Sequence, residues 1–176
     1  MSGRIFLFGD NIDTDVIAPG GYLHLPMDVL KMHCMEALDT DFANKVKPGD
    51  ILVAGANFGT GSSREQAPQA MKELGIDLIL AISFARIFFR NAVNVGMNIG
   101  VISEVDYLAI RDGEAAEFHD NPCTLSLKST GKVVNYESPN GPLKEIISAG
   151  GLINYVRKKT ESPTNVSDSM NCRNRK

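Results

Sequence analysis

Residues 77–102 read DLILAISFARIFFRNAVNVGMNIGVI. DLILAI is an almost continuous apolar run, which is typical of a strand covered on both faces of a sheet. The segment 83–96 has a candidate helix cap in Ser83 and a glycine at its end. NIGVI, at 98–102, has the composition of a second short buried strand. Strand, helix and strand in this order predict the α/β fold class.

The rest of the chain continues this alternation. Apolar runs predict further strands at 4–8 and at the end of 47–55. Helical spacing predicts helices at 27–38, 64–74, 103–113 and 141–159, the last broken at its glycine pair. The segment 123–136 is expected to form a hairpin that turns at Thr130 and Gly131. Because a hairpin is antiparallel, the sheet is expected to be mixed, with a barrel-like or sandwich core.

Composition bounds the number of domains. The chain has 176 residues, of which 43% are hydrophobic and 22% charged, enough for one domain with its own core. We expect that domain to span residues 1–160. Residues 161–176 are polar and lack any periodicity, so we expect a disordered tail there.

Charge and cysteine usage exclude several classes of protein. A net charge of −3 and a pI near 5.6 argue against a nucleic-acid binder. No apolar run is long enough to span a bilayer, and the first residues do not form a secretory signal. The cysteines and histidines are few and scattered, without a metal-binding spacing. The sequence therefore predicts a reduced, cytoplasmic protein that binds no metal by itself and contacts neither membrane nor nucleic acid.

The stretch GANFGTGSSREQA, residues 55–67, carries the most chemistry. Its glycines allow a tight turn and a close approach to a ligand. Ser62 and Glu65 have the spacing of a capping box, so one interpretation is only a capped helix. The other is an anion site, in which Arg64 and free helix N–H groups attract a carboxylate or phosphate beside reactive hydroxyls.

Three motifs in series distinguish these interpretations. GDNIDTDVIAPGGYL (9–23), GANFGTGSSREQA (55–67) and ISFARIFFRNAVNVG (82–96) together resemble the small subunits of 3-isopropylmalate dehydratases. These are free-standing counterparts of the C-terminal, swivelling domain of aconitase. The resemblance covers roughly Arg4–Val156. It implies a single three-layer β/β/α domain with a mixed, barrel-like sheet.

The resemblance also implies a reaction and a partner. Such small subunits act with a large subunit, whose four-iron–four-sulfur cluster serves as a Lewis acid in a hydro-lyase reaction on di- or tricarboxylates. In this family Ser62 is expected to be the base, as an alkoxide stabilised by Arg64 and by helix-terminal N–H groups. Ser63 and Arg64 are expected to bind a substrate carboxylate. The reaction is expected to interconvert 2-isopropylmalate and 3-isopropylmalate, in leucine biosynthesis.

Further site residues follow from the same resemblance. Asp15 is expected to act as an acid–base or orienting group, or, like Asp13, only to order its loop as an Asx-turn. Arg86 either reaches the site or pairs with an acidic loop residue. Leu23, His24 and Leu25 are expected to form a loop tip that selects the substrate side group. A solvent-exposed loop histidine is the simpler alternative for His24.

Other functions remain open at this point. The same chemistry would serve homoaconitate, dimethylmalate or citraconate, and only the loop around His24 separates these substrates. A non-enzymatic anion- or RNA-binding module disagrees with the acidic pI. A serine hydrolase would need a G-x-S-x-G elbow and a histidine partner, and GTGSSRE is not such an elbow.

Overall fold

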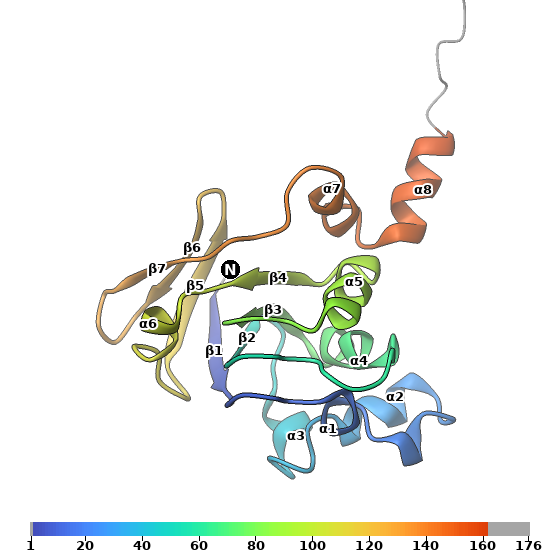
Figure 1. The fold of residues 1–176 in the computed structure, drawn as a ribbon, viewed down its shortest axis with the longest axis horizontal. Helices are drawn as coiled ribbons and strands as arrows, with labels where there is room; N and C mark the ends of the chain where they lie inside the picture. Colours follow the sequence, from blue (N-terminus) through green and yellow to red (C-terminus); the bar gives the residue numbers. More distant parts are fainter. Residues whose placement is uncertain (1, 162–176) are drawn as a thin grey trace, which may run out of the picture.

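One mixed sheet organises the computed structural model, which describes residues 2–161 (Figure 1). Its seven strands have the order β4-β3-β2-β1-β5-β6-β7. The parallel half consists of β1 (Ser2–Leu7), β2 (Asp50–Ala54), β3 (Ile76–Ala81) and β4 (Asn98–Val101). The antiparallel half consists of β5 (Ala115–Asp120), β6 (Cys123–Leu127) and β7 (Val133–Asn135).

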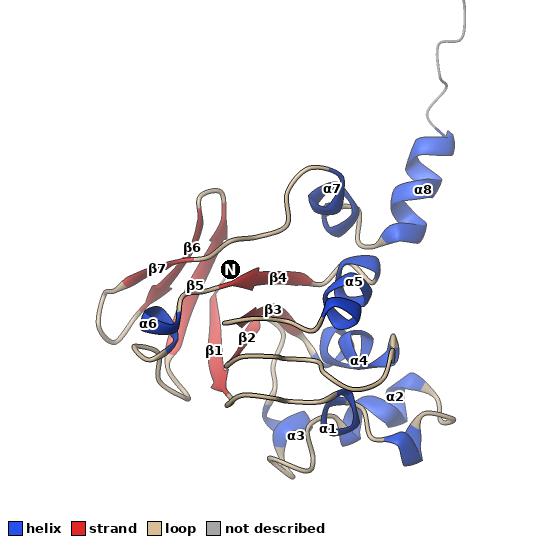
Figure 2. Cartoon of the chain, in the orientation of Figure 1, coloured by secondary structure: helices blue, strands red, loops and turns tan. Residues whose placement is uncertain are grey.

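Strand β1 joins the two halves. Its end, Ile5–Leu7, pairs in parallel with β2, whereas its start, Ser2–Arg4, pairs antiparallel with β5. The strand pairing therefore changes from antiparallel to parallel along β1. The antiparallel half curls over one face of the parallel half (Figure 2).

The helices are mostly short and cover the other face of the parallel half (Figure 1). The α-helices are α1 (Thr14–Ile17), α2 (Met27–Leu30), α3 (Phe42–Lys45), α4 (Gln66–Leu74), α5 (Arg86–Asn94), α6 (Glu104–Tyr107), α7 (Pro142–Ser148) and α8 (Leu152–Glu161). The 3-10 helices are η1 (Gly20–Tyr22) and η2 (Lys31–His33). Of these helices, α6 lies instead beside the antiparallel half, and α8 extends away from the body (Figure 1).

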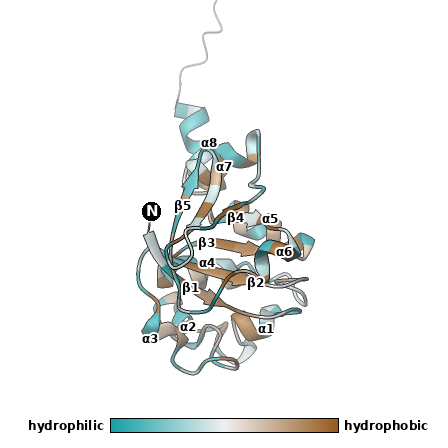
Figure 3. Ribbon diagram, turned by 90° about the vertical axis from the view of Figure 1, so that its left-hand side faces the viewer, coloured by the Kyte–Doolittle hydropathy of each residue, from teal (hydrophilic) through white to brown (hydrophobic). Residues whose placement is uncertain are grey.

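Two hydrophobic cores result from the alternation of side chains along the parallel strands. Phe6, Leu52 and Ile79 face the helices and belong to the larger core. Ile5 and Ile51 point the opposite way and pack with residues of the antiparallel half. Both faces of the parallel half are therefore covered, which explains the apolar character of β2 and β3 in Figure 3.

This arrangement confirms the predicted α/β class and the three-layer β/β/α architecture with a mixed, curled sheet. The predicted hairpin also forms, between β6 and β7. Strand β5 was not predicted. The predicted helical segment around 141–159 runs as α7 and α8, and α8 continues to Glu161, one residue beyond the predicted domain boundary. Of the tail expected at 161–176, all but Glu161 lies outside the described residues.

Two local predictions are wrong. The segment 27–38, expected to be one helix, forms only the short helices α2 and η2. The helix stops there because Met35 adopts a positive φ of 60°, with both Cys34 and Met35 buried in the helix-side core. Ser83 does not cap α5, which begins at Arg86 with Ala85 as its N-cap. The hydroxyl of Ser83 accepts a hydrogen bond from the amide of Asn57 instead, at 2.9 Å.

Within residues 2–161, no helix combines the length and the apolar character needed to cross a membrane.

Candidate active site at the carboxyl ends of the parallel strands

Three loops that follow β1, β2 and β3 lie side by side and are joined by backbone hydrogen bonds. Gly59 N–H donates to the carbonyl of Ile12 at 2.7 Å, and Thr14 N–H donates to that of Thr60 at 2.8 Å. Ala85 N–H donates to the carbonyl of Phe58 at 2.9 Å. The three family motifs therefore meet at the carboxyl edge of the parallel strands, which is where open α/β sheets usually bind ligands.

Two glycines are required for this close approach. Gly59 has a φ of +80°, and a Cβ added there would lie 2.2 Å from Cγ of Phe88. Gly61 has a φ of +94°, and a Cβ there would lie 3.1 Å from Oγ1 of Thr14. Larger residues would be strained at both positions and would push the loop away from its neighbours.

Ser62 does not form the capping box that its spacing predicted. Helix α4 begins only at Gln66, and its N-cap, Glu65, makes no side-chain capping hydrogen bond. The loop is instead drawn toward α1, where Ser62 meets Thr14. The interpretation of this stretch as a capped helix is therefore wrong, and Ser62 is free of a capping role.

Thr14 is the residue that holds Ser62. Ser62 N–H donates to Oγ1 of Thr14 at 3.0 Å, and Oγ1 donates to the Ser62 carbonyl at 3.2 Å. The two hydroxyl oxygens are 3.1 Å apart. Thr14 is only 1% exposed, whereas Ser62 is exposed. A buried threonine thus fixes an exposed serine at the mouth of the site.

Arg64 is anchored by groups of the first loop. Its Nη1 lies 2.5 Å from Oδ1 of Asp15 and donates to the carbonyls of Ala18 at 3.0 Å and Thr14 at 3.4 Å. The Arg64 side chain is 17% exposed and that of Asp15 is 62% exposed. All of these contacts use Nη1 rather than Nη2 or Nε. Asp15 holds Arg64. Asp13 caps α1 rather than forming an Asx-turn, since its side chain accepts from Val16 N–H at 2.8 Å.

Ser63 follows Ser62 on the exposed side of the same loop. Its carbonyl accepts a hydrogen bond from Nδ2 of Asn91 at 3.3 Å. Asn91 lies on α5 and is only 7% exposed. No role was predicted for Asn91 or Thr14, and they are distinguished only as polar side chains at buried positions.

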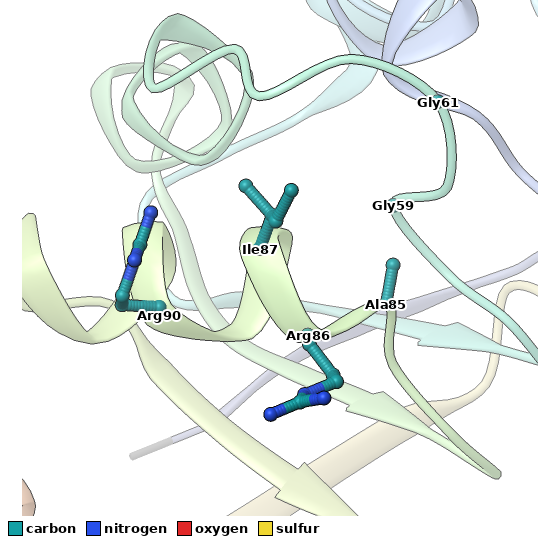
Figure 4. Close-up of a pocket in the computed structure, with 6 residues that line it drawn as sticks. All are labelled: Gly59, Gly61, Ala85, Arg86, Ile87 and Arg90. Carbon is teal, nitrogen blue, oxygen red and sulfur yellow. The ribbon is translucent and has the colours of Figure 1, made fainter.

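Arg86 stands at the first residue of α5. It lines an open hollow of about 560 Å³ with Gly59, Gly61, Ala85, Ile87 and Arg90 (Figure 4). The Arg86 side chain leaves α5 on the side opposite to Ile87 (Figure 4). Neither expected role of Arg86, in the site or in an ion pair with an acidic loop residue, is tested by this placement.

The loop around His24 begins beside Arg64. A Cβ added to Gly20 would lie 3.4 Å from Nη2 of Arg64. The ring of Tyr22 stacks on that of His33, with centroids 3.6 Å apart. Leu25 N–H donates to the Tyr22 carbonyl at 2.9 Å, so the loop is anchored on both sides of His24.

The predicted loop-tip residues differ in their surroundings. Leu23 packs partly against the helix-side core, and Leu25 is half-buried. His24 is exposed. The selection of a substrate side group by these three residues stays a prediction.

The described part of the chain does not fit an iron–sulfur cluster. Across residues 2–161, no three cysteine, histidine or acidic side chains gather in a way that could hold a metal ion. Cys34 is buried, and burial raises the pKa of its thiol, which disfavours the thiolate that a cluster needs.

Comparisons with known proteins identify the family of the chain. The aconitase C-terminal domain family matches residues 19–99. A methanogen homoaconitase small subunit from Methanocaldococcus jannaschii is 47% identical over 90% of this chain and 92% of its own length. The 3-isopropylmalate dehydratase small subunit of Halothermothrix orenii is 48% identical, over 89% of this chain and 95% of that relative.

A solved structure extends the agreement to three dimensions. The crystal structure of a 3-isopropylmalate dehydratase from Methanocaldococcus jannaschii superimposes with a TM-score of 0.85 and 44% identity. The match covers 90% of this chain and 94% of the other. This chain therefore belongs to the family of 3-isopropylmalate dehydratase small subunits, which share the fold of the aconitase C-terminal domain.

Proposed function

We propose that this chain is the small subunit of a hydro-lyase that interconverts 2-isopropylmalate and 3-isopropylmalate by dehydration and rehydration, in leucine biosynthesis. The observation that carries the proposal is the exposed residue Ser62, bound to Thr14 and two residues from Arg64, which Asp15 and two carbonyls hold in place. The site lies in a chain 48% identical to a 3-isopropylmalate dehydratase small subunit.

Each side chain then has a defined task. The Ser62 alkoxide takes the proton from the substrate carbon next to a carboxylate. The electron pair of that C–H bond forms the double bond, and the hydroxyl leaves the neighbouring carbon as hydroxide with the electron pair of the C–O bond. In the return step hydroxide adds to the carbon that lost the proton, and Ser62 gives its proton to the carbon that lost the hydroxyl, so that one water is lost and one regained. The free part of the Arg64 fork binds a substrate carboxylate, and the Ser63 hydroxyl adds a hydrogen bond to it.

The exposure of this site calls for a second chain. Ser62, Ser63 and Asp15 are all exposed, so this subunit alone cannot exclude water from the substrate. We propose that a large subunit covers the carboxyl edge of the parallel strands. The four-iron–four-sulfur cluster of this reaction is assigned to that subunit, where it would supply a Lewis acid.

Reconstitution tests the proposed function. The purified chain is expected to show no dehydratase activity, whereas the complex with an iron–sulfur large subunit converts 2- and 3-isopropylmalate. The measurement is steady-state turnover of the chain, the large subunit and their mixture on a panel of substituted malates. Turnover by the small subunit alone, shown free of any large subunit, would refute the need for a partner. A mixture active only on other malates would refute the substrate.

Homoaconitate is the second candidate substrate, because the methanogen relative is named a homoaconitase small subunit. The exposed His24 lies in the loop that starts beside Arg64, and residues 19–30 of this loop include no arginine or lysine to bind an extra substrate carboxylate. The apolar neighbours Leu23 and Leu25 suit an isopropyl group better. We therefore rank isopropylmalate first.

A substitution in this loop separates the two substrates. His24→Arg is expected to raise kcat/KM for homoaconitate relative to isopropylmalate by about ten- to a hundredfold, the effect of one new charge-assisted contact. The measurement is kcat/KM of the complex on both substrates. His119→Arg, an exposed histidine on β5, is the matched control and should leave the ratio unchanged. Equal losses on both substrates would show that the loop only closes the site.

A further inference from the structure

The hydroxyl of Thr14 has more partners than it has protons. Three atoms of Ser62 lie within hydrogen-bond distance of Oγ1: the amide nitrogen at 3.0 Å, the hydroxyl oxygen at 3.1 Å and the carbonyl oxygen at 3.2 Å. The amide can only donate. The single proton of Thr14 is therefore shared between the carbonyl and the hydroxyl oxygen of Ser62.

The charge of Ser62 decides between these two acceptors. While Ser62 carries its proton, its hydroxyl donates to Oγ1 of Thr14, and Thr14 donates to the carbonyl. Once Ser62 is an alkoxide, it can only accept, and it is the stronger acceptor. A rotation about the Cβ–Oγ1 bond of Thr14 then brings the proton to the alkoxide, without any movement of the backbone.

The surroundings keep Thr14 in position for this exchange. Its amide donates to the Thr60 carbonyl at 2.8 Å, and its carbonyl accepts from Ala18 N–H at 3.0 Å. It is 1% exposed, so water does not compete for its hydroxyl. Gly61 allows the contact, since a Cβ there would lie 3.1 Å from Oγ1.

Helix α4 offers less help to an alkoxide than the sequence suggested. The helix starts four residues after Ser62, at Gln66. In its first turn Ala67 N–H donates to the Arg64 carbonyl, and Pro68 has no N–H at all. Few free amides of this helix therefore remain to stabilise a charge on Ser62, which leaves that task to side chains.

We propose that Thr14 is a positioning residue of the Ser62 base: its buried hydroxyl donates to the Ser62 alkoxide and lowers the cost of removing the serine proton. The proposal rests on the proposed function of Ser62. Thr14 is not expected to touch the substrate. Other charged groups on the elements around Ser62 also act on it: Asp13, Asp15, Arg64, Glu65, Arg86 and Arg90.

Thr14→Val tests the proposal in the complex with the large subunit. Valine keeps the shape of threonine without its hydroxyl, and Thr14→Ser keeps the hydroxyl. At neutral pH, Thr14→Val is expected to lower kcat about ten- to a hundredfold with little change in KM, as expected for a lost hydrogen bond to a charged group. Thr14→Ser is expected to stay within a few-fold of the wild type.

The pH dependence separates a role in proton transfer from a role in folding. Losing a donor to the charged form raises the pKa of the base, so the limb on which activity rises with pH moves to higher pH. The shift is about one pH unit for each tenfold loss. The deficit of Thr14→Val therefore narrows as pH rises. The charged neighbours are the same in every variant, so the difference between profiles isolates Thr14.

Each outcome has a definite meaning. A deficit in Thr14→Val that stays the same while pH rises through the wild-type limb, or a Thr14→Val complex as active as the wild type, would overturn the proposal. If Thr14→Val does not fold, the profile of Thr14→Ala against that of Thr14→Ser decides in the same way. If the wild-type complex is inactive, or if Ser62→Ala is fully active, the proposed function of Ser62 is wrong, and the proposal for Thr14 is wrong as well.

Discussion

Ser62→Ala is expected to lower kcat of the complex by about 10²–10⁴-fold, because it removes a positioned group that transfers a proton. The protein should still fold. Ser62 is exposed and does not cap α4, so its hydroxyl contributes no capping energy. Its backbone amide keeps its hydrogen bond to Thr14. One neutral hydrogen bond is lost, which costs about 0.5–1.5 kcal/mol.

The measurements for this variant are kcat, KM, the thermal midpoint and the affinity for the large subunit. Ser148→Ala, an exposed serine on α7 far along the chain, is the matched control and should leave all four unchanged. The opposite pattern, a large loss of thermal stability with unchanged activity per folded complex, would contradict the catalytic role and leave Ser62 with a structural one.

Much of the fold could be predicted because its determinants are local. The apolar run in β3, the helical pattern of α5 and the glycines at their ends each act within a few residues, and the structure confirms them. Strand β5 escaped prediction, although Ala116 and Phe118 are buried on alternate positions. Its remaining residues are polar or small, so the period-2 signal is weak until β1 and β6 flank it.

Predictions failed where contacts distant in the sequence override local preference. The segment after α2 has helical spacing, but burying Cys34 and Met35 together required a turn with a positive φ at Met35. Ser62 and Glu65 have capping-box spacing, but Thr14, 48 positions away, binds the serine instead. Such a competition depends on which loops meet in space, and no local pattern records it.

The candidate site could be proposed from the sequence, but the contacts within it could not. The motifs around Asp15, Ser62 and Arg86 do meet at the carboxyl edge of the sheet, as a family resemblance implies. That Arg64 uses Nη1, and neither Nη2 nor Nε, for its contacts with the protein is seen only from the distances between Nη1 and its partners.

Arg64→Lys is expected to lower kcat/KM by about 10²-fold or more. Arg64 anchors itself through Nη1 to Asp15 and to the carbonyls of Ala18 and Thr14, which leaves Nη2 and Nε for a carboxylate. A lysine has a single nitrogen at the end of its chain, so it either anchors or binds, and it cannot make a bidentate contact. Each lost charge-assisted bond corresponds to about 1.5–3 kcal/mol.

The loss should appear in activity and much less in stability, because the Asp15 side chain is 62% exposed and exposed ion pairs stabilise proteins little. A double-mutant cycle with Asp15→Asn tests the mechanism. If Asp15 acts only by holding Arg64, Asp15→Asn should cost far less in the Arg64→Lys background than in the wild type. Arg157→Lys, on the exposed helix α8, should change nothing. Fully additive losses would show that Asp15 acts on the substrate directly, and a fully active Arg64→Lys complex would remove Arg64 from the carboxylate site.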